Sequence, residues 1–287
     1  MVKVAFLGTG LMGEPMVQRL LAAQVPVVAY NRTASKLEAL RISGAEIAEL
    51  PEKAIAQSDC VILMLTNADA VRELLLSEAS KQQLSGRTVI QMSTISPQES
   101  QEIHDAVVAV GGQYLEAPVL GSIPQVKAGE LQVMVGASPE QFEKWSDFLK
   151  NFGSPVLLGS VGAASATKLA LNQLIASLTT AFALSLGFVQ RQGVEVEAFM
   201  QILRQSALYA PTFDKKLQQM IDGNFANANF PTKHLLKDTN LFLNEAEAVG
   251  LNVSSLEGVR KVLEAAQQLG LADADYSSLF AAINPQK

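Results

Sequence analysis

Short apolar runs alternate with amphipathic stretches along the first half of the chain. Four runs rich in Val, Ile and Leu have the length of buried strands: Val2–Leu7, Val25–Tyr30, Cys60–Leu65 and Thr88–Met92. Helical spacing of apolar residues lies between them, at Glu14–Ala23, Ser35–Ser43, Pro51–Gln57 and Ala68–Leu76. This alternation is typical of a parallel sheet covered by helices on both faces, and it predicts an α/β domain.

The pattern changes near Gly162. Before it, three more candidate strands extend the sheet: Gln113–Ala117, Leu131–Val135 and Val156–Leu158. After it, helical periodicity dominates and strand-like runs disappear. We therefore expect an α/β domain over residues 1–162 and an all-α domain over residues 163–287, joined by a long helix near Ser165–Gln192. The length of 287 residues suits two domains, although one large α/β unit would also fit.

The long helix raises the question of a membrane. Residues 169–190 carry no charge and are numerous enough to span a bilayer. Polar residues interrupt them: Asn172, Gln173, Ser177, Thr179, Thr180 and Ser185. We interpret the segment as a buried helix of a soluble protein. The first apolar run ends after four residues in a glycine turn, unlike a signal peptide, so a cytoplasmic location is expected.

Composition narrows the classes of function. Hydrophobic residues make up 48% of the chain and charged residues 17%, which suits a folded core rather than a disordered chain. The formal charge of −6 leaves no basic footprint for a general nucleic-acid binder. One cysteine, Cys60, excludes a disulfide framework and a cysteine zinc site, and two histidines make another metal site unconvincing.

A glycine-rich loop follows the first strand. Gly8, Gly10 and Gly13 form a G-x-G-x-x-G that also contains Leu11 and Met12, and a helical pattern follows it. In this context the first glycine permits a tight turn, and the second lets the backbone approach a pyrophosphate. The third allows close packing of helix on strand. The loop predicts a dinucleotide site in a Rossmann-type doubly wound domain, and a purely structural turn is the alternative.

The second strand ends at Asn31-Arg32-Thr33. An NAD enzyme usually places Asp or Glu there to hold the ribose 2′-hydroxyl, and none is present. Arg32 could pair with a 2′-phosphate instead, with Asn31 and Thr33 as neutral donors. We therefore expect NADP(H) as the cofactor, unless Arg32 is an ordinary exposed loop residue.

The segment from Phe6 to Met16 resembles the opening motif of the β-hydroxyacid dehydrogenases. That family includes 3-hydroxyisobutyrate dehydrogenase, tartronate semialdehyde reductase and the glyoxylate/succinic semialdehyde reductases. The resemblance covers essentially the whole chain, and the Asn31–Thr33 trio is similar to the glyoxylate/succinic semialdehyde branch. By resemblance, Leu65, Thr66 and Thr94 contact the cofactor, and Thr94 also lines the active site.

Glu116-Ala117-Pro118-Val119-Leu120-Gly121-Ser122 resembles the family's substrate motif. Backbone amides near Gly121 and Ser122 could bind a carboxylate, because N–H groups in a tight turn form an anion site. Leu120 stands where the family normally has serine, which removes one donor to the substrate. The nature of the substrate is therefore less predictable from this motif.

Lys168 and Asn172 lie four residues apart, on one side of the long helix. The resemblance makes Lys168 the catalytic acid/base and gives Asn172 the task of positioning it or the substrate. Hydride addition to a carbonyl builds alkoxide charge, which a lysine can stabilise and protonate. Without the resemblance, a lysine that opens a helix is usually solvated. The glycine pair that precedes it in the family is kept only in part, as Gly162-Ala163-Ala164.

Residues 230–238 resemble the family's K-D motif. By resemblance, Lys237 reaches the cofactor or substrate, Asp238 orders it, and Phe230 helps to close the cleft. Alternating charges on a helix are otherwise most often a solvated face. The family commonly forms dimers or tetramers, so a homo-oligomer is expected.

Together these features predict an NADPH-dependent reductase of a small aldehyde or keto acid that carries a carboxylate, with glyoxylate and succinic semialdehyde as the leading pair. The alternatives are a 3-hydroxyisobutyrate or tartronate semialdehyde type of dehydrogenase, or a catalytically silent NADPH-binding protein. A 6-phosphogluconate dehydrogenase would need a much larger helical domain. Imine reductases typically lack a lysine at the place of Lys168.

Overall fold

The computed structural model describes residues 2–285, and it forms two compact units, Met1–Lys168 and Leu169–Lys287. The first unit holds the strands: β1 (Val4–Leu7), β2 (Val27–Tyr30), β3 (Glu46–Ile47), β4 (Cys60–Leu63), β5 (Thr88–Gln91), β6 (Gln113–Glu116), β7 (Val119–Leu120), β8 (Leu131–Gly136) and β9 (Gly153–Gly159). Its helices are α1 (Gly13–Ala22), η1 (Ala34–Lys36), α2 (Glu38–Ile42), α3 (Pro51–Ala56), α4 (Ala68–Leu75), α5 (Glu78–Lys81), α6 (Pro97–Ala109), α7 (Ile123–Ala128) and α8 (Pro139–Leu149). The helix α9 (Ala163–Arg191) runs from the first unit into the second, where α10 (Val196–Arg204), α11 (Pro211–Asp222), α12 (Thr232–Ala248), α13 (Ser254–Gln268), η2 (Tyr276–Ser278) and α14 (Leu279–Ile283) follow.

The sheet has the strand order β3-β2-β1-β4-β5-β6-β8-β7, and β9 pairs with β8. Neighbours from β3 to β6 are parallel, with Val4 opposite both Val27 and Cys60. This part has the order of a doubly wound nucleotide-binding sheet, whose switch point lies between β1 and β4. The predicted fold class is confirmed. The sheet is not parallel throughout, because β8 runs antiparallel to β6 and β7.

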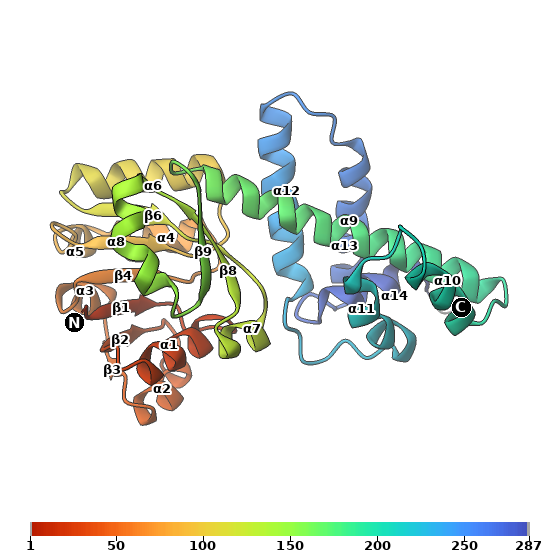
Figure 1. The fold of residues 1–287 in the computed structure, drawn as a ribbon, viewed down its shortest axis with the longest axis horizontal. Coiled ribbons are helices and arrows are strands. Elements are labelled where there is room, and N and C mark those ends of the chain that lie inside the picture. Colours follow the sequence, from red (N-terminus) through yellow and green to blue (C-terminus); the bar gives the residue numbers. More distant parts are fainter. Residues whose placement is uncertain (1, 286–287) are drawn as a thin grey trace. The chain divides into compact units, whose positions relative to one another are not determined.

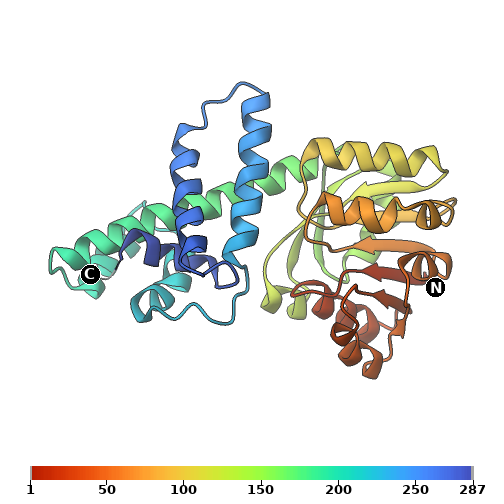
Figure 2. The same cartoon turned by 180° about the vertical axis from the view of Figure 1, so that it is seen from behind.

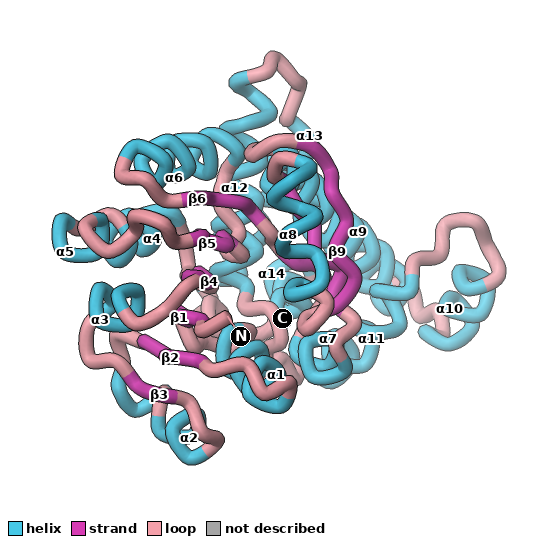
Figure 3. The backbone as a smooth tube through the Cα atoms, turned by 60° about the vertical axis from the view of Figure 1, so that its left-hand side comes forward, coloured by secondary structure: helices cyan, strands magenta, loops and turns pink. Residues whose placement is uncertain are grey.

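Successive residues of the central strands face opposite sides of the sheet. Val4 and Phe6 pack with α1, α2, α7 and α8, whereas Ala5 and Leu7 pack with α3, α4 and α6. Figures 1 and 3 show these helices on the two faces. Cys60 on β4 is fully buried, and that burial raises the pKa of its thiol. Burial on both faces explains why the central strands are almost continuously apolar.

Some local predictions were wrong. The stretch Ser35–Ser43 is not one helix, because η1 ends at Lys36 and α2 begins at Glu38, with Leu37 buried between them. The two-residue strands β3 and β7 were not predicted, since each is too short to show a periodic pattern.

Helices form the second unit, and its described residues contain no strand beyond an isolated bridge between Pro231 and Asp275. Figure 2 shows α12 and α13 side by side. Phe182 of α9 stacks on Phe213 of α11 with ring centroids 4.7 Å apart. By length and composition alone, α9 could cross a membrane. In this structure Ala176, Phe182, Ala183 and Leu186 of α9 belong to the core of the second unit, whereas Leu174, Leu178, Leu184 and Phe188 are exposed. The helix is therefore buried on one side, and not nearly all round as predicted.

Candidate functional site

The glycine loop connects β1 to α1 at the switch point of the sheet. Gly8 has φ +103°, and a Cβ there would clash with the carbonyl oxygen of Met64. A Cβ on Gly13 would clash with the carbonyl oxygen of Gly8. A Cβ on Gly10 would meet no atom within 4 Å. The outer glycines are therefore required by packing, and the middle one leaves the backbone open to a ligand.

The N-terminus of α1 carries no side-chain cap, because Met12 occupies the N-cap position. In the same unit, side chains of Asn67, Ser77, Ser96 and Ser138 cap α4, α5, α6 and α8. Uncapped backbone N–H groups and the positive end of the helix dipole favour an anion. The loop and helix together fit the pyrophosphate of a dinucleotide.

Two alanine substitutions separate the roles of these glycines. Gly13→Ala should lower the free energy of unfolding by about 1–3 kcal/mol, since the added methyl meets backbone that cannot move aside. Gly10→Ala, the matched control, should change it by less than about 0.5 kcal/mol, because the methyl points into open space. Urea unfolding without ligand measures both values. Equal losses would contradict the packing role of Gly13.

The end of β2 is held by a side-chain amide. Asn31 donates from Nδ2 to Thr9 Oγ1 at 3.0 Å, and its Oδ1 accepts from the backbone N–H of Thr33 at 2.8 Å. Arg32 and Thr33 are exposed between these contacts and η1. The place where an acidic residue would hold a ribose 2′-hydroxyl is thus occupied by an anchored amide and an exposed guanidinium.

A buried serine joins the loops after β4 and β5. Ser93 Oγ accepts from the backbone N–H of Leu65 at 2.7 Å. The side chain of Gln91 accepts from Ser93 N–H at 2.8 Å and donates to Ser93 O at 3.0 Å. These bonds hold Leu65 and Thr94 at neighbouring carboxyl ends of the sheet, with Thr94 half-buried and Thr66 exposed. Ser93 and Gln91 were missed as supporting residues, because a buried strand end gives no sequence signal for such bonds.

The substrate motif forms β7 and the start of α7. Gly121 has φ +136°, which favours glycine, and half-buried Leu120 precedes it opposite Gln132. Ser122 donates from both its backbone N–H and its hydroxyl to Gln125 Oε1, at 3.0 and 2.7 Å. A carboxylate bound by the Ser122 amide would therefore take the place of the Gln125 oxygen. Gln125 is a further residue that the sequence did not indicate.

The polar residues of α9 meet those of α12 within the second unit. Asn172 donates from Nδ2 to Asp238 Oδ2 at 2.6 Å, and Asp238 Oδ1 lies 2.8 Å from Lys237 Nζ. Asn172 Oδ1 is buried and accepts no hydrogen bond from the described protein. Lys168 lies one turn before Asn172 on the same helix and is only 9% exposed. Helix α9 thus carries a largely buried lysine, the last residue of the first unit, one turn before an amide that Asp238 anchors in the second.

Phe230 precedes α12, and His234 lies in the first turn of that helix. Phe230 packs edge-on against Tyr276, with ring centroids 5.9 Å apart. Burial lowers the pKa of His234, and the nearby positive charges of Lys237 and Lys233 lower it further. His234 is therefore a neutral neighbour of the Lys237–Asp238 pair near pH 7. No group of three or more His, Cys, Asp or Glu that could hold a metal ion occurs among residues 2–285.

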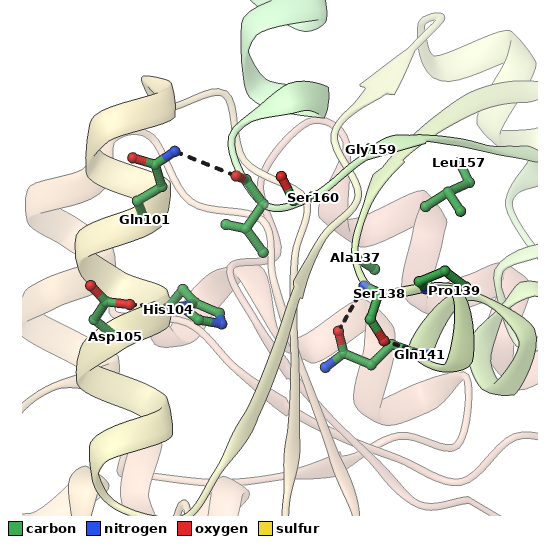
Figure 4. A pocket seen from close by; sticks show the side chains of 11 residues that line it. Gln101, His104, Asp105, Ala137, Ser138, Pro139, Gln141, Leu157, Gly159 and Ser160 are labelled. Atoms are coloured by element: carbon green, nitrogen blue, oxygen red, sulfur yellow. Dashed lines mark hydrogen bonds and ion pairs between the residues drawn. The ribbon is translucent and has the colours of Figure 1, made fainter.

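A pocket of about 670 Å³ lies elsewhere in the first unit, as Figure 4 shows. It is lined by three residues of α6, by the start of α8 and by the end of β9 with the turn after it: Gln101, His104, Asp105, Ala137, Ser138, Pro139, Gln141, Leu157, Gly159, Ser160 and Val161. The residues predicted from the sequence to bind cofactor or substrate do not line it.

Comparison with known proteins places the chain in a family. The NAD-binding domain of 6-phosphogluconate dehydrogenase matches residues 3–162, and the family described as the NAD-binding of NADP-dependent 3-hydroxyisobutyrate dehydrogenase matches residues 162–283. Glyoxylate/succinic semialdehyde reductase 2 of Arabidopsis thaliana, a chloroplastic protein, is 31% identical over 289 residues, which cover 100% of this chain and 80% of that protein. The chain belongs to the 3-hydroxyisobutyrate dehydrogenase-like family of β-hydroxyacid dehydrogenases.

Solved structures agree with a β-hydroxyacid dehydrogenase fold over the full length. A Mycobacterium tuberculosis 3-hydroxyisobutyrate dehydrogenase with L-serine has a TM-score of 0.89 at 22% identity and covers 99% of both chains. Psf3 in complex with NADP⁺ and 2-OPP has a TM-score of 0.85 at 24% identity, over 98% of this chain and 99% of that one. The protein is thus an NAD(P)-dependent oxidoreductase, and the resemblance of its motifs to this family is confirmed.

Proposed function

We propose that this β-hydroxyacid dehydrogenase is an NADPH-dependent reductase of small aldehydes or keto acids that carry a carboxylate, with glyoxylate and succinic semialdehyde as leading substrates. The observation that carries the proposal is the buried Lys168, one turn before an Asn172 that Asp238 anchors at 2.6 Å. The full-length similarity to a glyoxylate/succinic semialdehyde reductase supports the choice of substrates.

The first unit offers residues to hold each part of the cofactor. The glycine loop with Leu11 and Met12 takes the pyrophosphate, where Gly10 is open and α1 is uncapped. Arg32, between Asn31 and Thr33, takes the 2′-phosphate, since a guanidinium pairs well with phosphate oxygens. Leu65, Thr66 and Thr94 are assigned to the nicotinamide side. Lys237, on α12 of the second unit, is assigned to the cofactor by family resemblance alone. When bound, the reduced nicotinamide supplies a hydride to the substrate carbonyl carbon.

Lys168 serves as the general acid. As the carbonyl oxygen of the substrate becomes an alkoxide, Lys168 Nζ stabilises the negative charge and transfers a proton to that oxygen. The product is the hydroxy acid, and the neutral amine then regains a proton from solvent. Asn172 orients Lys168 or the substrate, because Asp238 fixes its amide and leaves Oδ1 as an acceptor. The low exposure of Lys168 strengthens these interactions, because charges attract each other more strongly where the local dielectric constant is low.

The substrate carboxylate is held near Gly121 and Ser122, with Thr94 as a hydroxyl donor. Leu120 supplies an apolar surface where the family normally has serine. A hydroxyl group on the substrate would be desolvated there without a partner, which is unfavourable. The motif therefore favours substrates without a hydroxyl beside the carbonyl group over hydroxylated ones. Phe230 and Asp238 complete the proposed substrate contacts.

Consumption of NADPH, with NADH in parallel, tests the proposal against glyoxylate, succinic semialdehyde, methylmalonate semialdehyde and tartronate semialdehyde. We expect turnover of one or both of the first two, with higher kcat/KM for NADPH. Preferred turnover of methylmalonate semialdehyde with NADH would favour a 3-hydroxyisobutyrate type of dehydrogenase. NADPH binding without turnover of any carbonyl acid would favour a silent binding protein and contradict the proposal.

A further inference from the structure

A buried carboxylate holds the first turn of α9. Glu116, the last residue of β6, is 1% exposed. Its Oε1 accepts from the backbone N–H groups of Gly162 and Ala164, both at 2.8 Å, and of Ser165 at 3.2 Å. These are amide groups that a helix cannot satisfy internally, and a negative charge beside them is favoured by the helix dipole.

The second oxygen of the carboxylate is held by hydroxyls. Oε2 accepts from Ser165 Oγ at 2.5 Å and from Ser100 Oγ at 2.7 Å. Tyr114 Oη lies 2.8 Å from Ser100 Oγ, and since the Ser100 proton points to Glu116, Tyr114 is the donor to Ser100. Burial raises the pKa of Tyr114, so this proton stays in place. The hydroxyl groups of Tyr114 on β6 and Ser100 on α6 thus form a hydrogen-bonded chain that ends on Oε2 of Glu116.

Two glycines lie against the Glu116 carboxylate. A Cβ on Gly136 of β8 would clash with Oε1, so the glycine makes space for the carboxylate. Gly162 reaches Glu116 with φ +103°, a conformation suited to glycine. The partial glycine pattern before Lys168 therefore keeps the glycine that this contact needs. The four hydrogen bonds from Gly162, Ala164 and Ser165 define both the position of the first turn and its rotation about the helix axis, and the fifth, from Ser100, fixes the carboxylate.

Lys168 follows Ser165 by three residues, which places the two one turn apart on adjoining positions of α9. A change in position or rotation of the first turn is carried directly to the Lys168 ammonium. Proton transfer is steeply sensitive to such displacements. Glu116 thus has the means to influence the reaction without contact with the substrate.

We propose that Glu116 is a positioning residue that acts through Lys168, not a residue that contacts the substrate as its place in the substrate motif would suggest. The proposal rests on the proposed role of Lys168 as the general acid. It predicts that the effect of removing the Glu116 charge disappears when Lys168 is absent.

The test is a double-mutant cycle of Glu116→Gln and Lys168→Ala. Glutamine keeps the size of the side chain and loses its charge. We expect Glu116→Gln to lower kcat by about 10- to 100-fold, with NADPH affinity measured by fluorescence changed less than about twofold. In the Lys168→Ala background, with methylammonium added as a substitute acid to give a measurable rate, Glu116→Gln should change kcat less than about twofold.

A purely structural role gives a different pattern. Ser138→Ala, which removes the cap of α8, should lower Tm without lowering kcat and controls for loss of a helix cap. If Glu116→Gln does not fold, Ser165→Ala takes its place in the cycle, with a smaller loss of kcat and the same disappearance of the effect. An equal loss in both backgrounds, or an unchanged kcat in the folded single variant, would overturn the proposal. Full activity of Lys168→Ala would remove Lys168 from the proposed mechanism, and this inference with it, whereas absence of turnover by the unaltered protein would overturn the proposed function itself.

Discussion

Lys168→Ala should lower kcat for carbonyl reduction by about 10²- to 10⁴-fold, the usual contribution of a positioned acid. Affinity for NADPH should stay within about threefold, because the glycine loop and Arg32 lie on other elements of the structure. Steady-state kinetics gives the first value, and quenching or enhancement of NADPH fluorescence gives the second. A loss in kcat without a loss in cofactor binding would assign Lys168 to the chemical step.

Lys150→Ala is the matched control. The side chain of Lys150 is 63% exposed and pairs with nearby Asp147 at the end of α8, so its removal should leave kcat unchanged. Turnover by Lys168→Ala at the rate of this control would remove Lys168 from the mechanism. The proposed function would then need another proton donor.

Arg32→Asp should reduce the ratio of kcat/KM for NADPH to that for NADH by about 10²- to 10³-fold. A charge-assisted hydrogen bond to phosphate is worth about 1.5–3 kcal/mol, and the new carboxylate adds repulsion of the 2′-phosphate. The same carboxylate can accept hydrogen bonds from a ribose 2′-hydroxyl, which improves NADH. Parallel kinetics with both cofactors at one ionic strength measures the ratio.

The control for Arg32→Asp is Arg41→Asp, which makes the same change in net charge on α2. Arg41 pairs with Glu38 at 2.7 Å on the exposed side of that helix. Arg41→Asp should leave the ratio of kcat/KM for NADPH to that for NADH nearly unchanged. If both variants shift the ratio equally, the change in net charge causes the shift, and not the loss of a contact between Arg32 and the 2′-phosphate. If Arg32→Asp has no effect, the 2′-phosphate role is excluded.

Much of the architecture follows from local pattern. Strands such as Cys60–Leu63 are buried on both faces, and this selects the continuous apolar runs that made them predictable. The glycine loop is equally local, since the spacing of its three glycines predicts the turn that it forms. By contrast, β7 is two residues long, and its antiparallel pairing with β8 depends on partners that no periodicity encodes.

The sequence indicated candidate site residues one by one, but not their arrangement or the residues that support them. Asn172 and Asp238 are 66 residues apart and meet only because α9 and α12 pack within one unit. Glu116 matched a substrate motif, yet its carboxylate faces backbone amides 46 to 49 residues later. Such hydrogen bonds depend on tertiary geometry, which the type of residue and its spacing do not reveal. Family resemblance supplied the expected roles of Lys168 and Asn172, and the structure adds the hydrogen bond that anchors Asn172.

Cys60 is the single cysteine of the chain, and because it is buried, thiol reagents do not reach it in the folded protein. Its thiol lies inside β4, in the middle of the sheet, and burial disfavours the reactive thiolate. A single cysteine introduced on the surface would therefore carry a fluorophore or spin label at one defined place, without prior removal of the native residue. Cys60 becomes reactive when the sheet opens, so the rate at which a thiol reagent modifies it measures how often the first unit opens.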